Sequence, residues 1–124
     1  MKKILIVEDN EPVREEIAAI LIDEGYQTFE SSSIEYAFRL FKEHAPDVVL
    51  SDIKMPEGSG YDLLAGLQKK SINSKFAFIF LSANNSMEDV RFGMNLGADD
   101  YIIKPFSSEE IVSSIRTRIK KLNR

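Results

Sequence analysis

The chain has 124 residues, no cysteine and a formal net charge of −4 at pH 7. This length allows one domain with a buried core and is too short for two. The lack of cysteine excludes a disulfide framework and a thiolate metal site, and the acidic balance argues against nucleic-acid binding by the surface as a whole. No apolar run approaches the ~20 residues of a membrane span, and the run behind Met1 ends at Glu8, too early for a secretory signal. We therefore expect a single cytoplasmic domain over residues 1–124 with no membrane partner.

Strand-like and helix-like segments alternate from the start of the chain. The run 3–7, which is apolar after Lys3, predicts a strand. Apolar residues then recur at helical spacing, and the helix is expected to begin at Asn10 or Glu11 and to end at Gly25. Residues 26–30 predict a short second strand.

The second helix is expected to begin at Ser32, because Ser32 and Glu35 have the spacing of a capping box. A third strand over residues 47–51 is rich in β-branched residues and stops at Asp52. Proline and glycine residues after Asp52 predict a loop, and a third helix follows Gly60.

Gly66 weakens that third helix, since glycine costs about 1 kcal/mol relative to alanine inside a helix. Residues 76–81 are continuously apolar, which predicts a strand covered on both faces. Ser86 is expected to open a fourth helix that Gly97 ends. A fifth strand over residues 101–103 and a fifth helix opened by a capping box of Ser107 and Glu110 complete the pattern.

Five strands alternating with five helices predict a doubly wound α/β fold. Right-handed crossovers place helices on both faces of such a parallel sheet. The pattern alone leaves the strand order open, and 2-1-3-4-5 is a common solution at this size.

Charged and polar residues follow four of the predicted strands. They are Glu8-Asp9, Asp52, Ser82-Ala83 and Lys104-Pro105. Because the carboxyl ends of parallel strands share one edge, we expect these residues to meet in one crevice. Each pair of carboxylates at ~4 Å would cost ~4 kcal/mol at an effective dielectric of ~20, so their convergence predicts a bound cation. Oxygen ligands with room for water favour Mg²⁺ over Ca²⁺, although any one of these acids taken alone could be a solvated loop residue.

Together these segments resemble the receiver domain of two-component response regulators, the CheY-like domains. The resemblance covers essentially the whole chain. Its motifs are Val7-Glu8-Asp9, Asp52-Ile53-Lys54-Met55-Pro56 with Gly58 and Gly60, Leu81-Ser82-Ala83, Gly97-Ala98-Asp99-Asp100-Tyr101 and Lys104-Pro105-Phe106. The resemblance implies a flavodoxin-like, CheY-like sheet of order 2-1-3-4-5.

The resemblance also implies a phosphorelay site. Asp52 would accept a phosphoryl group from a sensor histidine kinase or a histidine phosphotransfer protein. Asp9 and Asp52 would bind Mg²⁺ directly, Glu8 through water, and Lys54 through its backbone carbonyl. Ser82 would hydrogen-bond the phosphoryl group and Lys104 would pair with it. The domain would catalyse only its own aspartyl phosphorylation and dephosphorylation.

The resemblance further implies how the site is shaped and how it signals. Ala83 would leave space for a donor or water, Lys54 and Asn84 would tune the rate of phosphoryl loss, and Pro105 would follow a cis peptide bond. Ser82 and Tyr101 would form a switch that changes the surface of helix four, strand five and helix five. That surface could bind a second copy of the chain, and nucleic acid would be contacted only through an output domain in a longer chain.

Other interpretations of the same residues remain. A haloacid dehalogenase would need an acid where Lys54 stands, and a flavodoxin would need a phosphate loop in place of the acidic run after the first strand. A receiver fold that docks a partner without phosphorylation, or a fragment of a longer DNA-binding transcriptional regulator, stays open. His44 could act in a relay or complement the end of its helix. The basic C-terminal residues could contact DNA or serve as favourable charge at a helix end: Arg116, Arg118, Lys120, Lys121 and Arg124.

Overall fold

One parallel sheet forms the centre of the molecule. The computed structural model describes residues 1–70 and 75–123, so Arg124 lies outside the described part. The sheet has the order β2-β1-β3-β6-β7, which confirms the predicted order 2-1-3-4-5. Its strands are β1 (Lys3–Val7), β2 (Gln27–Ser31), β3 (Val48–Asp52), β6 (Ala77–Ser82) and β7 (Asp100–Ile103).

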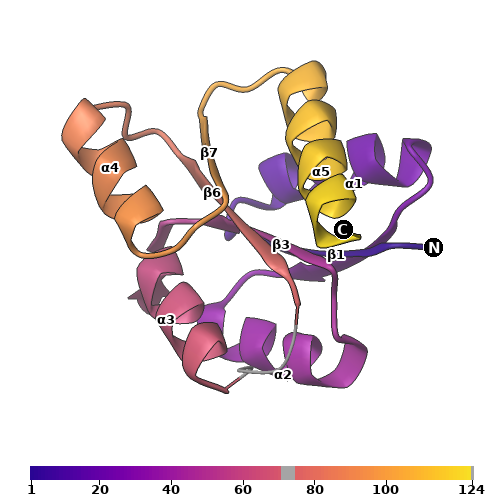
Figure 1. The fold of residues 1–124 in the computed structure, drawn as a ribbon, viewed down its shortest axis with the longest axis horizontal. Coiled ribbons are helices and arrows are strands. Elements are labelled where there is room, and N and C mark those ends of the chain that lie inside the picture. The colour runs from indigo at the N-terminus through magenta and orange to yellow at the C-terminus, as the bar shows by residue number, and fades with distance from the viewer. Residues whose placement is uncertain (71–74, 124) are drawn as a thin grey trace.

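Helices cover both faces of this sheet, as the alternating pattern predicts. Figure 1 shows α1 and α5 together on one side and α2 and α3 on the other. In the described part of the chain, no helix is long and apolar enough to cross a membrane. The helices are α1 (Glu11–Asp23), α2 (Ile34–His44), α3 (Gly60–Lys70), α4 (Met87–Asn95) and α5 (Ser108–Leu122).

Alternate residues of each central strand enter two separate cores. In β1, Ile4 and Ile6 pack in the core beneath α1 and α5, whereas Leu5 and Val7 pack in the core beneath α2 and α3. Successive side chains of a strand point to opposite faces. A strand buried on both faces therefore has a continuous apolar run, which is the pattern seen in the sequence.

Serine and asparagine side chains begin four of the helices. Asn10, Ser86 and Ser107 cap α1, α4 and α5, and Ser107 forms the predicted capping box with Glu110. The prediction for α2 was wrong by one residue, because Ser33 is the cap and its hydroxyl accepts from Tyr36 N at 3.2 Å. Strand β2 runs on to Ser31, whose hydroxyl donates to the Ser33 carbonyl and so turns the chain one residue later.

A small antiparallel hairpin occupies the loop predicted after Asp52. Its strands are β4 (Lys54–Met55) and β5 (Gly58–Ser59), paired Lys54 to Ser59 and Met55 to Gly58. The Gly60 amide then donates to the Ile53 carbonyl at 2.8 Å. The hairpin thereby returns the chain to the end of β3, so that α3 begins beside Asp52.

Candidate functional site

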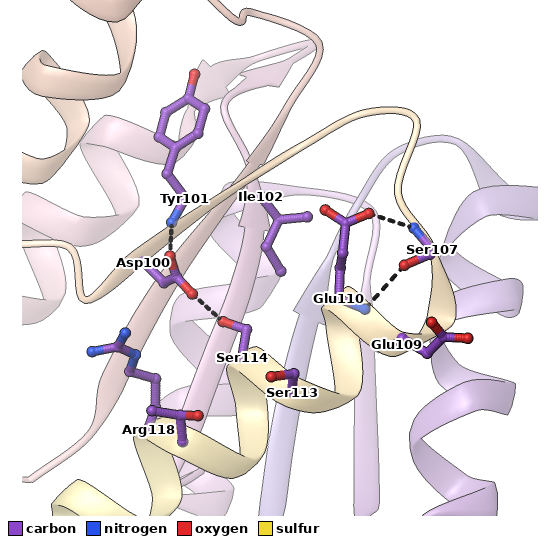
Figure 2. A pocket seen from close by; sticks show the side chains of 10 residues that line it. Asp100, Tyr101, Ile102, Ser107, Glu109, Glu110, Ser113, Ser114 and Arg118 are labelled. Carbon is purple, nitrogen blue, oxygen red and sulfur yellow. Dashed lines mark hydrogen bonds between the residues drawn. The ribbon is translucent and has the colours of Figure 1, made fainter.

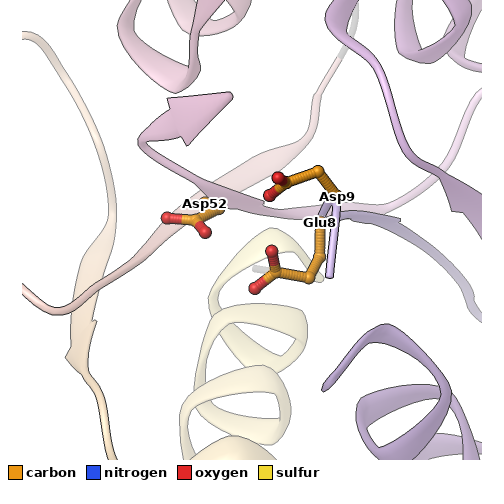
Figure 3. A group of neighbouring side chains, drawn as sticks. All are labelled: Glu8, Asp9 and Asp52. Carbon is orange, nitrogen blue, oxygen red and sulfur yellow. The ribbon is translucent and has the colours of Figure 1, made fainter. Parts of the chain in front are cut away.

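Three carboxylates meet at the carboxyl edge of the sheet. Glu8 and Asp9 follow β1, and Asp52 is the last residue of the neighbouring strand β3. Figure 3 shows the carboxylates of Glu8 and Asp9 pointing toward Asp52, and one oxygen of each of the three side chains lies within 4.8 Å of the others. Glu8 and Asp52 are buried, whereas Asp9 is exposed. The predicted convergence of these acids is therefore present in the fold.

Lys104 joins two of these acids. Its Nζ lies 2.6 Å from Glu8 Oε1 and 2.9 Å from Asp52 Oδ2. The residue directly follows β7, two strands away from Asp52 in the sheet, and its backbone N–H donates to the Ser82 carbonyl at 2.8 Å. The Lys104–Pro105 peptide bond is cis, as the resemblance implies. Lysine thus supplies one positive charge between two buried carboxylates.

Burial and neighbouring charges shift the pKa values of Glu8 and Lys104. Burial is the largest influence on Glu8 and raises its pKa, and the Asp52 charge adds to this, against the lowering effect of hydrogen bonds from Lys104 and Asn10. Burial alone would lower the pKa of Lys104, but its hydrogen bonds to Glu8 and Asp52 and their charges together raise it. Lys104 is therefore held firmly in its charged form, whereas ionised Glu8 is only partly compensated.

Both carboxylate oxygens of Asp52 already have donors. The Ile53 backbone amide donates to Oδ1 at 2.7 Å, and Lys104 donates to Oδ2. Two donors hold the side chain in one orientation at the mouth of the crevice. This is the arrangement expected of a positioned nucleophile or of a metal ligand.

Ser82 ends β6, the next strand of the sheet, and is buried. Its hydroxyl accepts from the Asn84 amide at 3.0 Å. Ala83 and Asn84 are exposed at the rim, so small or polar groups border the crevice on this side. The structure thus brings Ser82 and Lys104 to the same edge as Asp52.

Tyr101 lies on β7, paired with Phe80 of β6, and is half-buried. Its hydroxyl donates to the Asn84 carbonyl at 3.0 Å, and its ring meets the Phe80 ring edge-on at 6.2 Å between centroids. Gly93 of α4 lies against both rings, since a Cβ there would be 3.1 Å from Phe80 Cδ2 and 3.2 Å from Tyr101 Cδ2. Tyr101 therefore connects the loop after Ser82 with α4.

Lys54 and His44 differ in their relation to the acids. Lys54 is exposed in β4, two residues beyond Asp52. His44 ends α2 at the opposite edge of the sheet, where its carbonyl accepts from Lys3 Nζ and its ring stacks on Phe29 at 4.0 Å. The fold therefore separates the single histidine from the acidic cluster.

Two contacts to Glu8 were missed from the sequence. The Asn10 amide donates to Glu8 Oε2 at 3.2 Å, and Arg14 Nη1 donates to the Glu8 backbone carbonyl at 2.9 Å. The only signal available was their place in the loop and first turn after the acid pair, which is too common to be informative.

The donor set is suited to a hard divalent cation. It consists of carboxylate oxygens alone, with no histidine or cysteine beside them. Three acids against the single charge of Lys104 leave a net negative crevice, which a divalent cation would balance. The residues present therefore fit Mg²⁺.

The model of the response regulator receiver domain family matches residues 4–116. The chain belongs to this family, a class of signalling domains of two-component systems.

Curated relatives are transcriptional regulators by name. The chain is 34% identical over 122 residues to the phosphate regulon transcriptional regulatory protein PhoB of Escherichia coli, covering 98% of this chain and 53% of PhoB. It is 37% identical over 123 residues to the probable transcriptional regulator ycf27 of Guillardia theta, covering 99% of this chain and 47% of that protein. The chain thus spans about half the length of these relatives.

Solved structures share the fold. A receiver domain from Clostridium thermocellum superposes with a TM-score of 0.89 at 28% identity, covering 98% of this chain and 96% of the other. The non-phosphorylated HemR receiver domain of Leptospira biflexa gives 0.86 at 31% identity, with 96% and 94% covered.

Proposed function

We propose that residues 1–124 form one receiver domain that accepts a phosphoryl group on Asp52 from the phosphohistidine of a sensor kinase or a histidine phosphotransfer protein. The observation that carries this proposal is the contact of Lys104 Nζ with Asp52 Oδ2 at 2.9 Å inside the three-acid cluster. A purely solvated loop acid would need neither a buried position nor a charged partner.

The proposed transfer is a displacement at phosphorus. An oxygen of Asp52 bonds to the phosphorus as the P–N bond of phosphohistidine breaks, and the released imidazole nitrogen keeps the electron pair and takes a proton from water. Lys104 offsets the negative charge brought by the phosphoryl oxygens, and the Ser82 hydroxyl donates a hydrogen bond to one of them. Hydrolysis of the acyl phosphate later restores Asp52, so the domain acts on itself and is otherwise a signalling module.

Glu8, Asp9 and Asp52, together with the Lys54 backbone carbonyl, would hold Mg²⁺. When bound, Mg²⁺ supplies charge neutralisation to the phosphoryl oxygens. Asp9 is the exposed member and can bind the ion directly, whereas Glu8 is tied to Lys104 and would act through water. Both roles depend on the loop after β1 presenting its two acids toward Asp52.

The neighbouring residues would set the lifetime of the acyl phosphate. Ala83 leaves room for a donor or for water, and Lys54 and Asn84 border the path of an attacking water from exposed positions. Pro105 fixes the chain directly after Lys104. Substitutions at Lys54 or Asn84 would then change the rate of phosphoryl loss more than the stability of the fold.

The proposed output surface is formed by α4, β7 and α5. Exposed apolar side chains of this surface are Met87, Phe92, Met94, Leu96 and Ile103. A groove with a volume of about 470 Å³ lies between β7 and α5. Figure 2 shows Asp100, Glu110 and Arg118 among the side chains that line it. Such a mixed apolar and charged surface fits a second copy of the chain.

The proposed switch links Asp52 to this surface. The phosphoryl group would draw the Ser82 hydroxyl inward, and Tyr101 would then leave Asn84 and turn toward the space beside β6. Two or three new hydrogen bonds to the phosphoryl group, each worth about 1.5–3 kcal/mol, would reach the ~5.5 kcal/mol needed to reverse a 1:99 equilibrium.

A cytoplasmic location fits this relay. The length and names of the relatives favour a DNA-binding output domain in a longer chain, since the chain spans about half of PhoB. Nucleic acid would then be contacted by that domain.

Acetyl phosphate with Mg²⁺ tests the central proposal. Intact-mass spectrometry is expected to show one added phosphoryl group on the wild-type chain and none on Asp52→Asn, with the label removed by hydroxylamine. Exposed Asp62→Asn serves as the matched control and should label normally. No label on the wild type would favour the interaction module that works without phosphorylation, and a hydroxylamine-stable label would exclude an acyl phosphate.

A further inference from the structure

Arg14 connects three segments around the acidic cluster. It lies in the N-terminal part of α1, its Nη1 donates to the Glu8 backbone carbonyl at 2.9 Å, and its Nε lies 3.3 Å from Glu30 Oε1 on β2. Its side chain is only 16% exposed. A long charged side chain held at two points and largely buried has lost most of its rotamer freedom.

The Glu8 peptide is the point where β1 gives way to the loop. The Glu8 amide still donates to the Ser31 carbonyl of β2 at 3.0 Å, but the strand has ended at Val7. Beyond that point, Arg14 is the donor to the Glu8 carbonyl. A half-buried carbonyl without a donor is costly, so Arg14 stabilises this particular turn of the chain.

That carbonyl belongs to the peptide that joins Glu8 to Asp9. Lys104 and Asn10 hold the Glu8 carboxylate directly. Within residues 1–70 and 75–123, no side-chain hydrogen bond holds the exposed Asp9 carboxylate. The direction of Asp9 therefore depends on the peptide plane to which Arg14 donates.

We propose that Arg14 is a positioning residue for the cation site, which orients the Glu8–Asp9 peptide so that the Asp9 carboxylate faces Asp52. The inference rests on the proposed Mg²⁺ site and adds a residue to its support. The positive charge of Arg14 cannot by itself support the cation site, because a positive charge beside such a site repels the cation. Glu30 offsets that repulsion by pairing with Arg14.

A positioning role and a purely electrostatic role of Arg14 therefore predict different effects of its removal on Mg²⁺ binding. If Arg14 positions the loop, its removal weakens Mg²⁺ binding. Loss of a residue that orients metal ligands typically lowers metal affinity by about 10–100-fold. If Arg14 is merely one more positive charge, its removal leaves Mg²⁺ binding unchanged or strengthens it.

The test is calorimetric titration of Mg²⁺, with electron paramagnetic resonance of Mn²⁺ as a second readout. Arg14→Met keeps the apolar stem and removes both the charge and the donors, and it is expected to weaken binding about tenfold. Arg14→Lys restores one donor and is expected to recover most of the affinity. Arg116→Met is the matched control, because Arg116 also pairs with a glutamate, Glu24, at 3.3 Å but lies on α5. It should bind Mg²⁺ as the wild type does.

Urea unfolding in EDTA separates positioning from loss of the fold. Equal or tighter Mg²⁺ binding by folded Arg14→Met would overturn the inference while leaving the proposed function in place. If Arg14→Met does not fold, Arg14→Lys decides. Its single donor should leave Mg²⁺ binding measurably weaker than that of the wild type but stronger than that of Asp9→Asn, and binding equal to or tighter than that of the wild type would overturn the inference. No Mg²⁺ binding by the wild type would overturn the proposed site and this inference together.

Discussion

Gly60 packs directly against the backbone carbonyl of Asp52. Its amide donates to the Ile53 carbonyl at 2.8 Å, and a Cβ at this position would overlap the Asp52 carbonyl oxygen. Because backbone atoms cannot turn aside as a flexible side chain can, only glycine allows α3 to begin this close to β3. The first residue of a helix thereby helps to place the side chain proposed as the phosphoacceptor.

We expect Gly60→Ala to lower the free energy of unfolding by about 1–3 kcal/mol, since the added methyl overpacks the site. It should also slow labelling of Asp52 by acetyl phosphate. Urea denaturation and intact-mass spectrometry measure the two effects.

Gly66→Ala is the control within the same helix. Its Cβ would lie 2.5 Å from Phe38 Cζ, far from the acids, so we expect a loss of stability with normal labelling of Asp52. Wild-type stability and labelling of Gly60→Ala would show that the contact with Asp52 has no consequence.

Lys104→Ala is expected to retain the fold and to impair phosphorylation of Asp52 or the response to it. In Mg²⁺-free buffer the variant should lose about 2 kcal/mol of stability, the scale of a hydrogen bond to a charged group, because Glu8 and Asp52 lose their shared cation. Since the pKa of Lys104 is raised in the folded state, this deficit should be full below its ordinary pKa of 10.5 and shrink as the pH rises through the raised value. Added Mg²⁺ should restore part of the loss, and a variant as stable as wild type in EDTA at pH 7 would contradict this role.

Glu8→Gln should stabilise the Mg²⁺-free protein in a pH-dependent way. Burial raises the pKa of Glu8, so the folded state binds its proton more tightly than the unfolded state does, and the ionised group opposes folding. The free energies of unfolding of the variant and the wild type should therefore be closest below pH 4.5, the ordinary pKa of the group. As the pH rises above that value, the variant should become increasingly more stable than the wild type.

Thermal unfolding in EDTA between acid and neutral pH measures this difference. Mg²⁺ should reverse it by stabilising the wild type more than Glu8→Gln. A difference that does not change with pH would show that ionisation of Glu8 is not its cause.

Tyr101→Phe removes the hydroxyl that donates to the Asn84 carbonyl. Loss of this neutral hydrogen bond, worth about 0.5–1.5 kcal/mol, should shift the proposed switch toward the inward position of the ring. Amide exchange of α4 and β7 in the absence of beryllofluoride, a mimic of the phosphoryl group, should then move toward that of the wild type with beryllofluoride. Labelling of Asp52 should remain.

Ser82→Ala provides the opposite comparison, since it removes the hydroxyl that would sense the phosphoryl group. It should show little exchange response to beryllofluoride. If α4 and β7 of the wild type do not respond either, or if Ser82→Ala responds like the wild type, the switch is wrong as described.

The order of the elements was predictable because burial acts on short stretches of the chain. Residues 4–7 and 76–81 are apolar throughout because both faces of the sheet are covered, and Asn10, Ser86 and Ser107 carry the side chains that helix caps need. The candidate site could then be located, because acids, a serine and a lysine follow four strands whose carboxyl ends share one edge of a parallel sheet. The cap of α2 was missed by one residue, because the choice between Ser32 and Ser33 depends on where β2 ends.

Only the tertiary structure decided which side chains form hydrogen bonds, ion pairs or packing contacts with one another. Lys104 is bonded to Glu8 and Asp52, although 96 and 52 residues separate it from them. Gly66 looks like a defect of α3 in the sequence, yet its Cβ would collide with Phe38 of α2. The sequence by itself determined the elements and the chemistry available at their ends, because those depend on local periodicity and residue type. The structure decided the roles of Gly60 and Arg14, because these depend on distances between segments that no local pattern encodes.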